Sequence, residues 1–214
     1  MMALNVPRPT TEELQTISKL GVSRESLERI EAFLSLLFDW QRKTNLVSPA
    51  TLPKVWTRHV IDSLQLLPYL NAPSGAIADL GSGGGFPGII LAIASGRPVD
   101  LYESNQKKAA FLSEALRVSR ATGSVKLGRL EDVATPVKGR YAYVTARALA
   151  PLPELLSYAA PFIASGATGL FLKGKDADLE LTESAKSWRI KMDKQQSLTD
   201  SEAVLLAVKE ISRV

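Results

Sequence analysis

The chain has 214 residues, 45% of them hydrophobic, which is enough to bury one sizeable core. It contains no cysteine and one histidine, which excludes disulfides, thiolate metal ligands and cysteine nucleophiles and argues against a structural metal site, so we expect no metal. The formal net charge of +4 is concentrated in residues 76–150, where 10 Lys and Arg stand against 6 Asp and Glu.

The sequence shows no signal-peptide pattern near its start, because no basic stretch leads into an apolar run. No uninterrupted apolar stretch reaches the roughly 18 residues that a membrane span needs. We therefore expect a cytoplasmic protein that makes no membrane contact.

Two amphipathic helices are predicted near the N-terminus. Thr10 and Glu13 have the spacing of a capping box, and Gly21 would end the first helix. Ser23 can cap the second helix. Its core-facing positions recur at helical spacing and are Leu27, Ile30, Leu34 and Leu37.

A third helix is predicted from Pro53 to just before Asn71, because proline is favoured in a first helical turn. Residues 71–75 have the composition of a linker. We therefore predict an N-terminal helical extension over residues 1–75 and a catalytic domain over residues 76–214, packed as one globular unit.

Short apolar runs alternate with helical segments after residue 75, which predicts βαβ units and a parallel sheet. The clearest helix is Asn105–Arg120. The predicted strands are Ala76–Leu80, Val99–Tyr102, Val125–Leu127, Tyr141–Thr145, Gly169–Leu172, Arg189–Met192 and Ala203–Ile211. The last two form a hairpin, which is typical of a methyltransferase sheet rather than of a six-stranded dinucleotide dehydrogenase. The prediction is a Rossmann-like α/β fold with a seven-stranded, mostly parallel sheet.

A glycine-rich loop, Asp79–Gly88, follows the first predicted strand. Gly81, Gly83 and Gly85 allow a sharp turn and a close approach of the main chain to a ligand. The dinucleotide fingerprint requires Gly or Ala where this chain has Phe86. The loop therefore favours a nucleoside ligand without a pyrophosphate.

Two acids follow the next two strands. Glu103 lies at the end of the second strand, where a carboxylate can accept both hydrogens of a ribose diol. Leu130 and Glu131 follow the third strand and would offer an apolar contact and an acceptor near an adenine. In register with the glycine loop, these residues predict a cofactor site.

Several residue blocks resemble a known family, the bacterial ribosomal RNA small subunit methyltransferase G, also called glucose-inhibited division protein B. The resemblance runs from about Leu36 to about Gly174. The matching blocks are Asn45-Leu46, His59-Val60-Ile61-Asp62-Ser63-Leu64, the loop Asp79–Gly88, Lys107-Lys108, Phe111-Leu112, Ala146-Arg147-Ala148 and Leu172-Lys173-Gly174. Departures from the usual family residues occur at Gln41, Val47 and Gly84.

The resemblance implies a class I S-adenosylmethionine-dependent methyltransferase that makes 7-methylguanosine in 16S rRNA. By motif, the implied cofactor contacts are Gly81, Phe86, Leu130, Glu131 and Arg147, with Glu103 at the ribose position. From the loop we add Gly83 and Gly85 to the predicted cofactor site. The expected partner is 16S rRNA, within a small-subunit ribosomal particle, and the expected oligomeric state is a monomer.

The residue types present in the chain exclude some methyl-transfer reactions and leave others open. Covalent methylation of pyrimidine carbon 5 requires a cysteine, which is absent, and Thr145–Ala148 stands where exocyclic-amine enzymes carry Asp/Asn-Pro-Pro-aromatic. Attack by a ribose 2′-hydroxyl requires a base, for which Lys173 remains a candidate. Guanine nitrogen 7 has a free lone pair and requires no general base. We therefore name no catalytic residue, although Arg147 could lie at the mouth of the site or form a salt bridge with a strand-end carboxylate.

Predicted substrate contacts are the polar and basic residues of the matching blocks and of the preceding helices. They are Arg42, Lys43, Arg58, His59, Ser63 and Lys173. Three alternatives stay open: a methyltransferase of a small molecule or of another RNA, a nucleotide-dependent oxidoreductase, and a ribosome-assembly factor without turnover.

Overall fold

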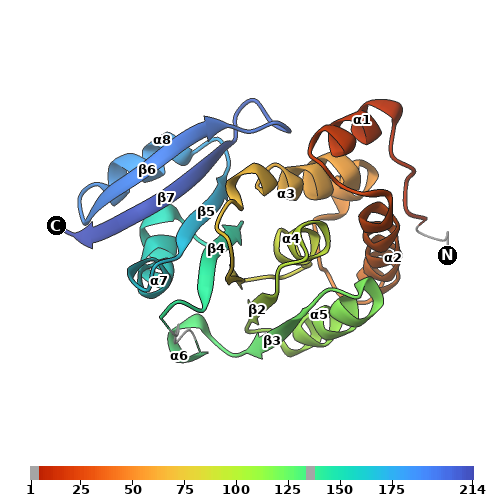
Figure 1. Cartoon of the computed structure of the whole chain (residues 1–214), viewed down its shortest axis with the longest axis horizontal. Coiled ribbons are helices and arrows are strands. Elements are labelled where there is room, and N and C mark those ends of the chain that lie inside the picture. The colour runs from red at the N-terminus through yellow and green to blue at the C-terminus, as the bar shows by residue number, and fades with distance from the viewer. Residues whose placement is uncertain (1–4, 134–137) are drawn as a thin grey trace.

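A seven-stranded sheet forms the centre of the computed structural model, which describes residues 5–133 and 138–214 (Figure 1). The strand order is β3-β2-β1-β4-β5-β7-β6, and β7 pairs antiparallel with both of its neighbours. The strands are β1 Ala76–Leu80, β2 Val99–Glu103, β3 Gly123–Leu127, β4 Tyr141–Arg147, β5 Thr168–Lys173, β6 Trp188–Gln196 and β7 Val204–Arg213. The predicted Rossmann-like, mostly parallel sheet of seven strands is confirmed.

The terminal hairpin is longer than its sequence pattern indicated. β6 begins at Trp188 and extends to Gln196, well beyond the predicted Arg189–Met192. The added residues Asp193 and Lys194 are exposed, so this stretch carries no apolar alternation to reveal a strand. Pairing with β7 fixes it instead, through a ladder that runs to Gln196 opposite Val204. The tip of this hairpin, residues 197–203, reaches the functional site.

Helices cover both faces of the sheet (Figure 1). α4 Gly88–Ser95 and α5 Gln106–Ser119 lie on one face, with α2 Arg24–Gln41 packed outside them. α7 Leu152–Ala164 and α8 Ala177–Ser184 cover the other face, and the short α6 Leu130–Val133 follows β3. The carboxyl ends of β1, β2, β4 and β5 are therefore left for the site.

The first two predicted helices are confirmed with their caps. α1 spans Thr11–Lys19, and Thr10 forms the complete capping box with Glu13. Ser23 caps α2 by accepting the amide of Ser26. On α2, Ile30, Leu34 and Leu37 are fully buried and Leu27 is half-buried.

The predicted third helix, Pro53 to Asn71, is wrong as a single regular element. The segment consists of four short pieces: η1 Pro49–Lys54, η2 Trp56–Ile61, α3 Asp62–Leu64 and η3 Leu67–Tyr69. Pro53 and Pro68 lack the amide donor that a continuous α-helical ladder requires, and η2 is a wider π-helical turn. This irregular segment places Arg58, His59 and Asp62 beside the sheet.

The N-terminal helices share one apolar cluster with the sheet. Phe33 of α2 is buried together with Ile77 of β1 and Ile90 of α4. The boundary predicted at residue 75 therefore lies between segments that bury their side chains in common, and it stays a prediction. None of the helices within residues 5–133 and 138–214 is long and apolar enough to cross a bilayer.

Candidate active site

Two adjoining cavities open at the carboxyl ends of the parallel strands. The larger has a volume of about 490 Å³ and the smaller about 290 Å³. Both are lined by Gly81, Gly83, Lys108 and Ala148. They therefore form two halves of one cleft, at the place where ligands bind in open α/β sheets.

The glycine loop separates the halves. Gly81 and Gly83 have φ angles of +65° and +52°, which favour glycine. A Cβ atom on Gly81 would lie 2.5 Å from Leu149 Cδ1, whereas a Cβ on Gly83 would have the oxygen of Gly81, at 3.7 Å, as its nearest neighbour. A side chain at position 83 would therefore project into the cleft and fill space that a ligand could occupy.

Gly85 plays a different part from the one predicted. It is buried and lines neither cavity. A Cβ there would lie 2.9 Å from Ile89 and 3.2 Å from Phe33. Gly85 therefore allows the loop to pack on α2 and α4, and the structure gives it no surface for a cofactor contact.

Glu103 ties the loop to the next helix. Its Oε2 accepts the amide of Gly83 at 2.9 Å and its Oε1 accepts the amide of Asn105 at 2.7 Å. Asn105 in turn caps α5. The carboxylate is buried against the smaller cavity, where each oxygen keeps acceptor capacity beyond its one backbone bond.

The smaller cavity contains the predicted Leu130 and Glu131 and, among residues that the sequence did not single out, Tyr158. The Tyr158 hydroxyl lies 3.1 Å from Glu131 and 2.7 Å from Glu154. A hydrogen bond from its own backbone amide and the Tyr158 hydroxyl lower the pKa of Glu131. Tyr158 lies on α7, and no motif marks it in the sequence.

Asp79 lies buried beneath the loop. Its Oδ1 accepts the Thr145 hydroxyl at 2.7 Å, whereas Oδ2 has no hydrogen-bond partner within the described residues. Burial raises the pKa of this carboxyl to about 6, against the lowering effect of the Thr145 and other hydrogen bonds. Gly88 is required beside it, because a Cβ there would lie 2.7 Å from Oδ2.

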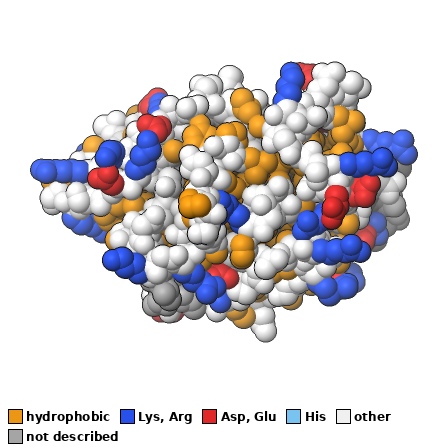
Figure 2. Space-filling model, viewed as in Figure 1, with side chains coloured by type: hydrophobic (Ala, Val, Ile, Leu, Met, Phe, Trp, Pro, Cys, Tyr) orange, Lys and Arg blue, Asp and Glu red, His pale blue; other side chains and the backbone are white. Residues whose placement is uncertain are grey.

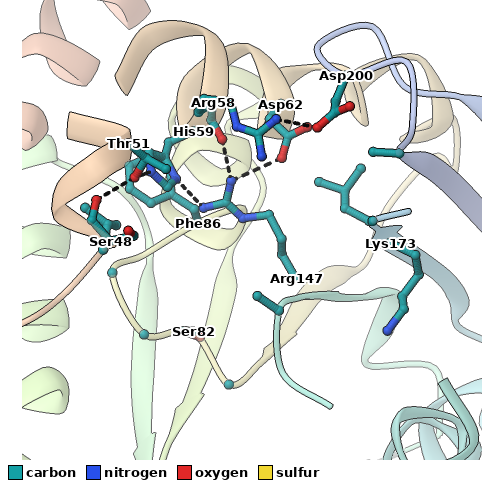
Figure 3. Close-up of a pocket in the computed structure, with 18 of the residues that line it drawn as sticks. Ser48, Thr51, Arg58, His59, Asp62, Ser82, Phe86, Arg147, Lys173 and Asp200 are labelled. Carbon is teal, nitrogen blue, oxygen red and sulfur yellow. Dashed lines mark hydrogen bonds and ion pairs between the residues drawn. The ribbon is translucent and has the colours of Figure 1, made fainter. Parts of the chain in front are cut away.

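Arg147 is the central cation of the larger cavity (Figure 3). Its Nη1 donates to the carbonyl of Arg58 at 2.8 Å and to Asp62 Oδ2 at 3.1 Å, and its Nη2 donates to His59 Nδ1 at 2.6 Å. The guanidinium carbon also lies 5.3 Å from the centre of the Phe86 ring. Arg147 lines the cavity and forms an ion pair, but its partner is Asp62 of α3 and not the predicted strand-end carboxylate, and its place at the mouth of the site stays a prediction.

His59 extends the hydrogen-bond network of Arg147 toward η1. Its Nε2 lies 2.8 Å from the Thr51 hydroxyl, which donates to the carbonyl of Ser48 at 2.7 Å. The imidazole stacks on Phe86 with ring centres 4.9 Å apart. Burial and the charges of Arg147 and Arg58 lower the pKa of His59 to about 3, so the ring is neutral.

The tip of the β6–β7 hairpin closes one side of the larger cavity. Arg58 pairs with Asp200 at 2.6 Å, and Asp62 accepts the Thr199 hydroxyl at 2.7 Å. Gln65 accepts the amide of Leu198 at 2.9 Å. The irregular segment and the hairpin tip, more than 130 residues apart in sequence, are thereby joined.

Lys173 lies across the larger cavity from Ser48 and Thr51 in Figure 3, at the end of β5 opposite Val204 of β7. Its ammonium pairs with Glu180 at 2.6 Å and donates to the carbonyl of Ala150 at 3.0 Å. Glu180 also accepts the amide of Leu152 at the start of α7. The ammonium is thus engaged in holding the chain after β4, which argues against a free amine acting as a base.

The predicted substrate residues divide into three groups. Arg58, His59 and Lys173 line the larger cavity. Arg42 and Lys43 are exposed and lie outside both cavities. Ser63 is fully buried and donates to the carbonyl of His59, which argues against a direct substrate contact. Within the described residues, no cluster of three His, Asp or Glu side chains could hold a metal.

Two solved structures share this architecture over nearly their whole length. Cofactor-bound Rv0187 from MTB superposes with a TM-score of 0.61 over 96% of this chain and 100% of that one, at 17% identity. The O-methyltransferase from Bacillus cereus in complex with SAH gives 0.60 over 94% and 98%, at 13% identity. At such identity the likeness concerns the fold, which is that of class I S-adenosylmethionine-dependent methyltransferases.

Relatives in sequence identify the family to which the chain belongs within this class. The profile of the family described as GidB, rRNA small subunit methyltransferase G, matches residues 26–207. The ribosomal RNA small subunit methyltransferase G of Bradyrhizobium sp. (strain ORS 278) is 49% identical over 95% of this chain and 93% of its own length. That of Paramagnetospirillum magneticum is 48% identical over 94% and 96%. The chain therefore belongs to the rRNA small subunit methyltransferase G family, as its residue blocks predicted.

Proposed function

We propose that this protein transfers a methyl group from S-adenosylmethionine to nitrogen 7 of a guanine in 16S rRNA. The observation that carries the proposal is the divided cleft, in which Gly83 opens to both halves and Glu103 lies against the smaller one. One half suits a nucleoside and the other a second reactant. Membership of the family supplies the RNA as that reactant.

The smaller cavity suits the adenosine part of the cofactor. Glu103 retains acceptor capacity for the ribose hydroxyls, and Leu130 with Glu131 offers an apolar contact and an acceptor for adenine. A side chain at position 83 would fill the space beside the loop. With glycine there, one bound ligand can extend from the smaller cavity into the larger. These residues fit a nucleoside cofactor without a pyrophosphate.

The larger cavity suits the amino-acid end of the cofactor and the target base. Gly81, Phe86 and Arg147 line it. Among the described residues, Arg147 uses three of its five N–H donors, which leaves two for an anionic group such as the cofactor carboxylate. When bound, S-adenosylmethionine supplies a methyl group already activated on a sulfonium.

The residues of the site agree with a reaction that needs positioning rather than proton transfer. Guanine nitrogen 7 attacks with a free lone pair, so no side chain has to remove a proton first. His59 is neutral with both ring nitrogens engaged, and the ammonium of Lys173 is paired with Glu180. We therefore assign no general base and propose that the cavity holds nitrogen, methyl carbon and sulfur in line.

The RNA is proposed to approach over a basic surface. Arg58 and Lys173 lie at the larger cavity, whereas Arg42 and Lys43 would contact phosphates outside it. Figure 2 shows Lys and Arg side chains mainly toward the periphery of one face, interspersed with Asp and Glu, around a centre of apolar and uncharged atoms. The proposed substrate is 16S rRNA within a small-subunit particle, bound by a monomer of this protein in the cytoplasm.

The test is a methyl-transfer assay with labelled S-adenosylmethionine, offered in parallel to naked 16S rRNA, small-subunit particles and small phenols. Digestion to nucleosides followed by mass spectrometry should show the label in 7-methylguanosine from one RNA source. Label in a phenol, or in a ribose-methylated nucleoside, would overturn the proposed substrate but not the proposed cofactor. An absence of transfer together with an absence of S-adenosylhomocysteine binding would overturn both.

A further inference from the structure

The single histidine of the chain lies in the middle of a row of polar contacts on the wall of the larger cavity (Figure 3). Arg147 donates to Nδ1 at 2.6 Å. Nε2 lies 2.8 Å from the Thr51 hydroxyl, and that hydroxyl lies 2.7 Å from the carbonyl of Ser48. The row therefore runs from β4 through η2 to η1.

The chemistry of the groups fixes the direction of every bond in this row. A guanidinium can only donate, so His59 Nδ1 must accept and carries no hydrogen. The neutral ring then carries its hydrogen on Nε2 and donates to the Thr51 oxygen, while Thr51 donates its own hydrogen to the carbonyl of Ser48. The neutral imidazole with its hydrogen on Nε2 is therefore the form of His59 that satisfies every hydrogen bond in the row.

The ring has little surface left for a substrate. Its exposed fraction is 8%, and that of Phe86, on which it stacks, is 4%. Both ring nitrogens are occupied from inside the protein. A direct contact between His59 and the RNA, as the sequence suggested, would require one of these bonds to break.

We propose that His59 is a positioning residue: its neutral imidazole, anchored at Nε2 by Thr51, aims the guanidinium of Arg147 into the larger cavity, toward the place proposed for the amino-acid end of the cofactor. This inference rests on the proposed function, because it assumes that Arg147 meets the anionic end of the cofactor. Thr51 acts one step further away, by accepting the Nε2 hydrogen and holding that side of the ring in place.

The charges around the ring keep it in this state. Arg147 and Arg58 face it from β4 and η2, Asp62 neutralises Arg147, and Asp200 neutralises Arg58. Asp79 acts on Arg147 from beneath the loop. Protonation of Nδ1 would place a hydrogen against the Arg147 donor and a third positive charge beside two others. The arrangement is therefore insensitive to pH across the physiological range.

The first test reads the tautomer directly. Because the chain has one histidine, the protein labelled with ¹⁵N in the imidazole gives one pair of ring-nitrogen signals. We expect a protonated Nε2 and an unprotonated Nδ1, unchanged from about pH 8 to about pH 5. A titration centred near the ordinary histidine pKa, or a hydrogen on Nδ1, would overturn the proposal.

The second test separates the two bonds with a matched pair of variants. In His59→Asn, the side-chain amide lies near the position of Nδ1, and Arg147 can still donate to its carbonyl oxygen. In His59→Gln, the amide lies near the position of Nε2, so Arg147 loses its acceptor. We expect His59→Gln to weaken S-adenosylhomocysteine binding by roughly tenfold and His59→Asn by much less. The KM for the cofactor should rise in the same order, with kcat at saturating cofactor nearly constant.

A variant pair at Thr51 tests the more distant contact without touching the ring. Thr51→Ser keeps the hydroxyl and should retain cofactor binding close to that of the unaltered protein, whereas Thr51→Val leaves the Nε2 hydrogen without its acceptor and should weaken cofactor binding, with Nδ1 still unprotonated because Arg147 donates to it. Equal cofactor binding by His59→Asn and His59→Gln, both folded by circular dichroism, would overturn the positioning role while the proposed function stands. An unaltered protein that binds no S-adenosylhomocysteine would instead overturn the proposed function, and the nitrogen spectra would still decide the tautomer.

Discussion

The two halves of the cleft are built in different ways. The smaller cavity takes its key residues from the ends of consecutive βα units, with Glu103 bonded to the amide of Gly83, 20 residues away in the chain. The larger cavity takes its wall from segments far apart, with Arg147 bonded to His59 across 88 residues. One half is held mainly by backbone amides and the other by side-chain charges, so the two should respond differently to mutation, pH and salt.

The largest effect is expected where the halves meet. Gly83→Asp would project a carboxylate into the space between the cavities, and we expect S-adenosylhomocysteine affinity to fall about 100-fold or more. Isothermal calorimetry measures this loss. Gly96→Asp is the matched control, because Gly96 also has a positive φ, of +72°, at an exposed helix end with open space around it. Similar affinity losses in both variants would mean that backbone strain, and not occupation of the cleft, is responsible.

The second effect concerns the wall of the larger cavity. Asp62 accepts bonds from Arg147, Gln65 and Thr199, and its side chain is 15% exposed. Asp62→Ala should lower the free energy of unfolding by about 3 kcal/mol, because it leaves a mostly buried guanidinium unpaired. Denaturant unfolding measures this loss.

Asp193→Ala provides the control for that prediction. Asp193 pairs with Lys209 on the surface, where both side chains are more than half exposed. Its removal should change the free energy of unfolding by about 0.5 kcal/mol or less. If both substitutions cost the same, the charged wall contributes no more to stability than a surface pair.

The third effect is a pH dependence to which His59 of the charged half and Asp79 beneath the loop contribute with opposite sign. His59 has its pKa lowered from 6.5 to about 3, so the unfolded chain takes up a proton at a higher pH than the folded protein. Its contribution to stability is fully present above pH 6.5 and is lost as the pH falls toward 3. Asp79, with its pKa raised from 3.8 to about 6, acts oppositely, since its stability contribution is present below pH 3.8 and lost as the pH rises through 6.

Comparison with His59→Asn isolates the histidine from Asp79 and from the other carboxylates. The difference in unfolding free energy between the unaltered protein and the variant should fall by about 1.4 kcal/mol per pH unit below the ordinary histidine pKa. Urea unfolding at a series of pH values measures it. A difference that stays constant with pH would contradict a buried neutral imidazole.

The sequence predicted the residues of the smaller cavity, which is held mainly by backbone amides, well. It predicted those of the larger, charged cavity only in part. The glycine loop, Glu103, Leu130 and Glu131 follow strands whose apolar runs are visible in the sequence, so their meeting at one sheet edge could be expected. Tyr158 could not be, because nothing near it in the sequence marks the face of α7 that it occupies.

In the charged half, the sequence identified Arg147, His59 and Lys173 but not their partners. Asp62 was visible as part of a residue block, yet its pairing with Arg147 depends on the irregular turns of residues 49–69, of which the part from Pro53 onward was predicted as one regular helix. Asp200 lies in a polar hairpin tip that has no motif. Such pairings depend on tertiary packing, which local periodicity does not encode.

The smallest predicted effect tests whether the hairpin tip belongs energetically to the charged half. Arg58 and Asp200 join η2 to the tip at 2.6 Å, with side chains 43% and 32% exposed. Exposure screens such a pair, so a double-mutant cycle with Arg58→Ala and Asp200→Ala should give only a weak coupling, which falls as salt is raised. The cycle for Lys191 and Glu210, a pair within the hairpin that is more than two-thirds exposed, should give still less. A coupling no larger than that of the control would mean that the tip is held by Asp62 and Gln65 alone, and that the Arg58–Asp200 pair is free to open toward an RNA phosphate without a cost in stability.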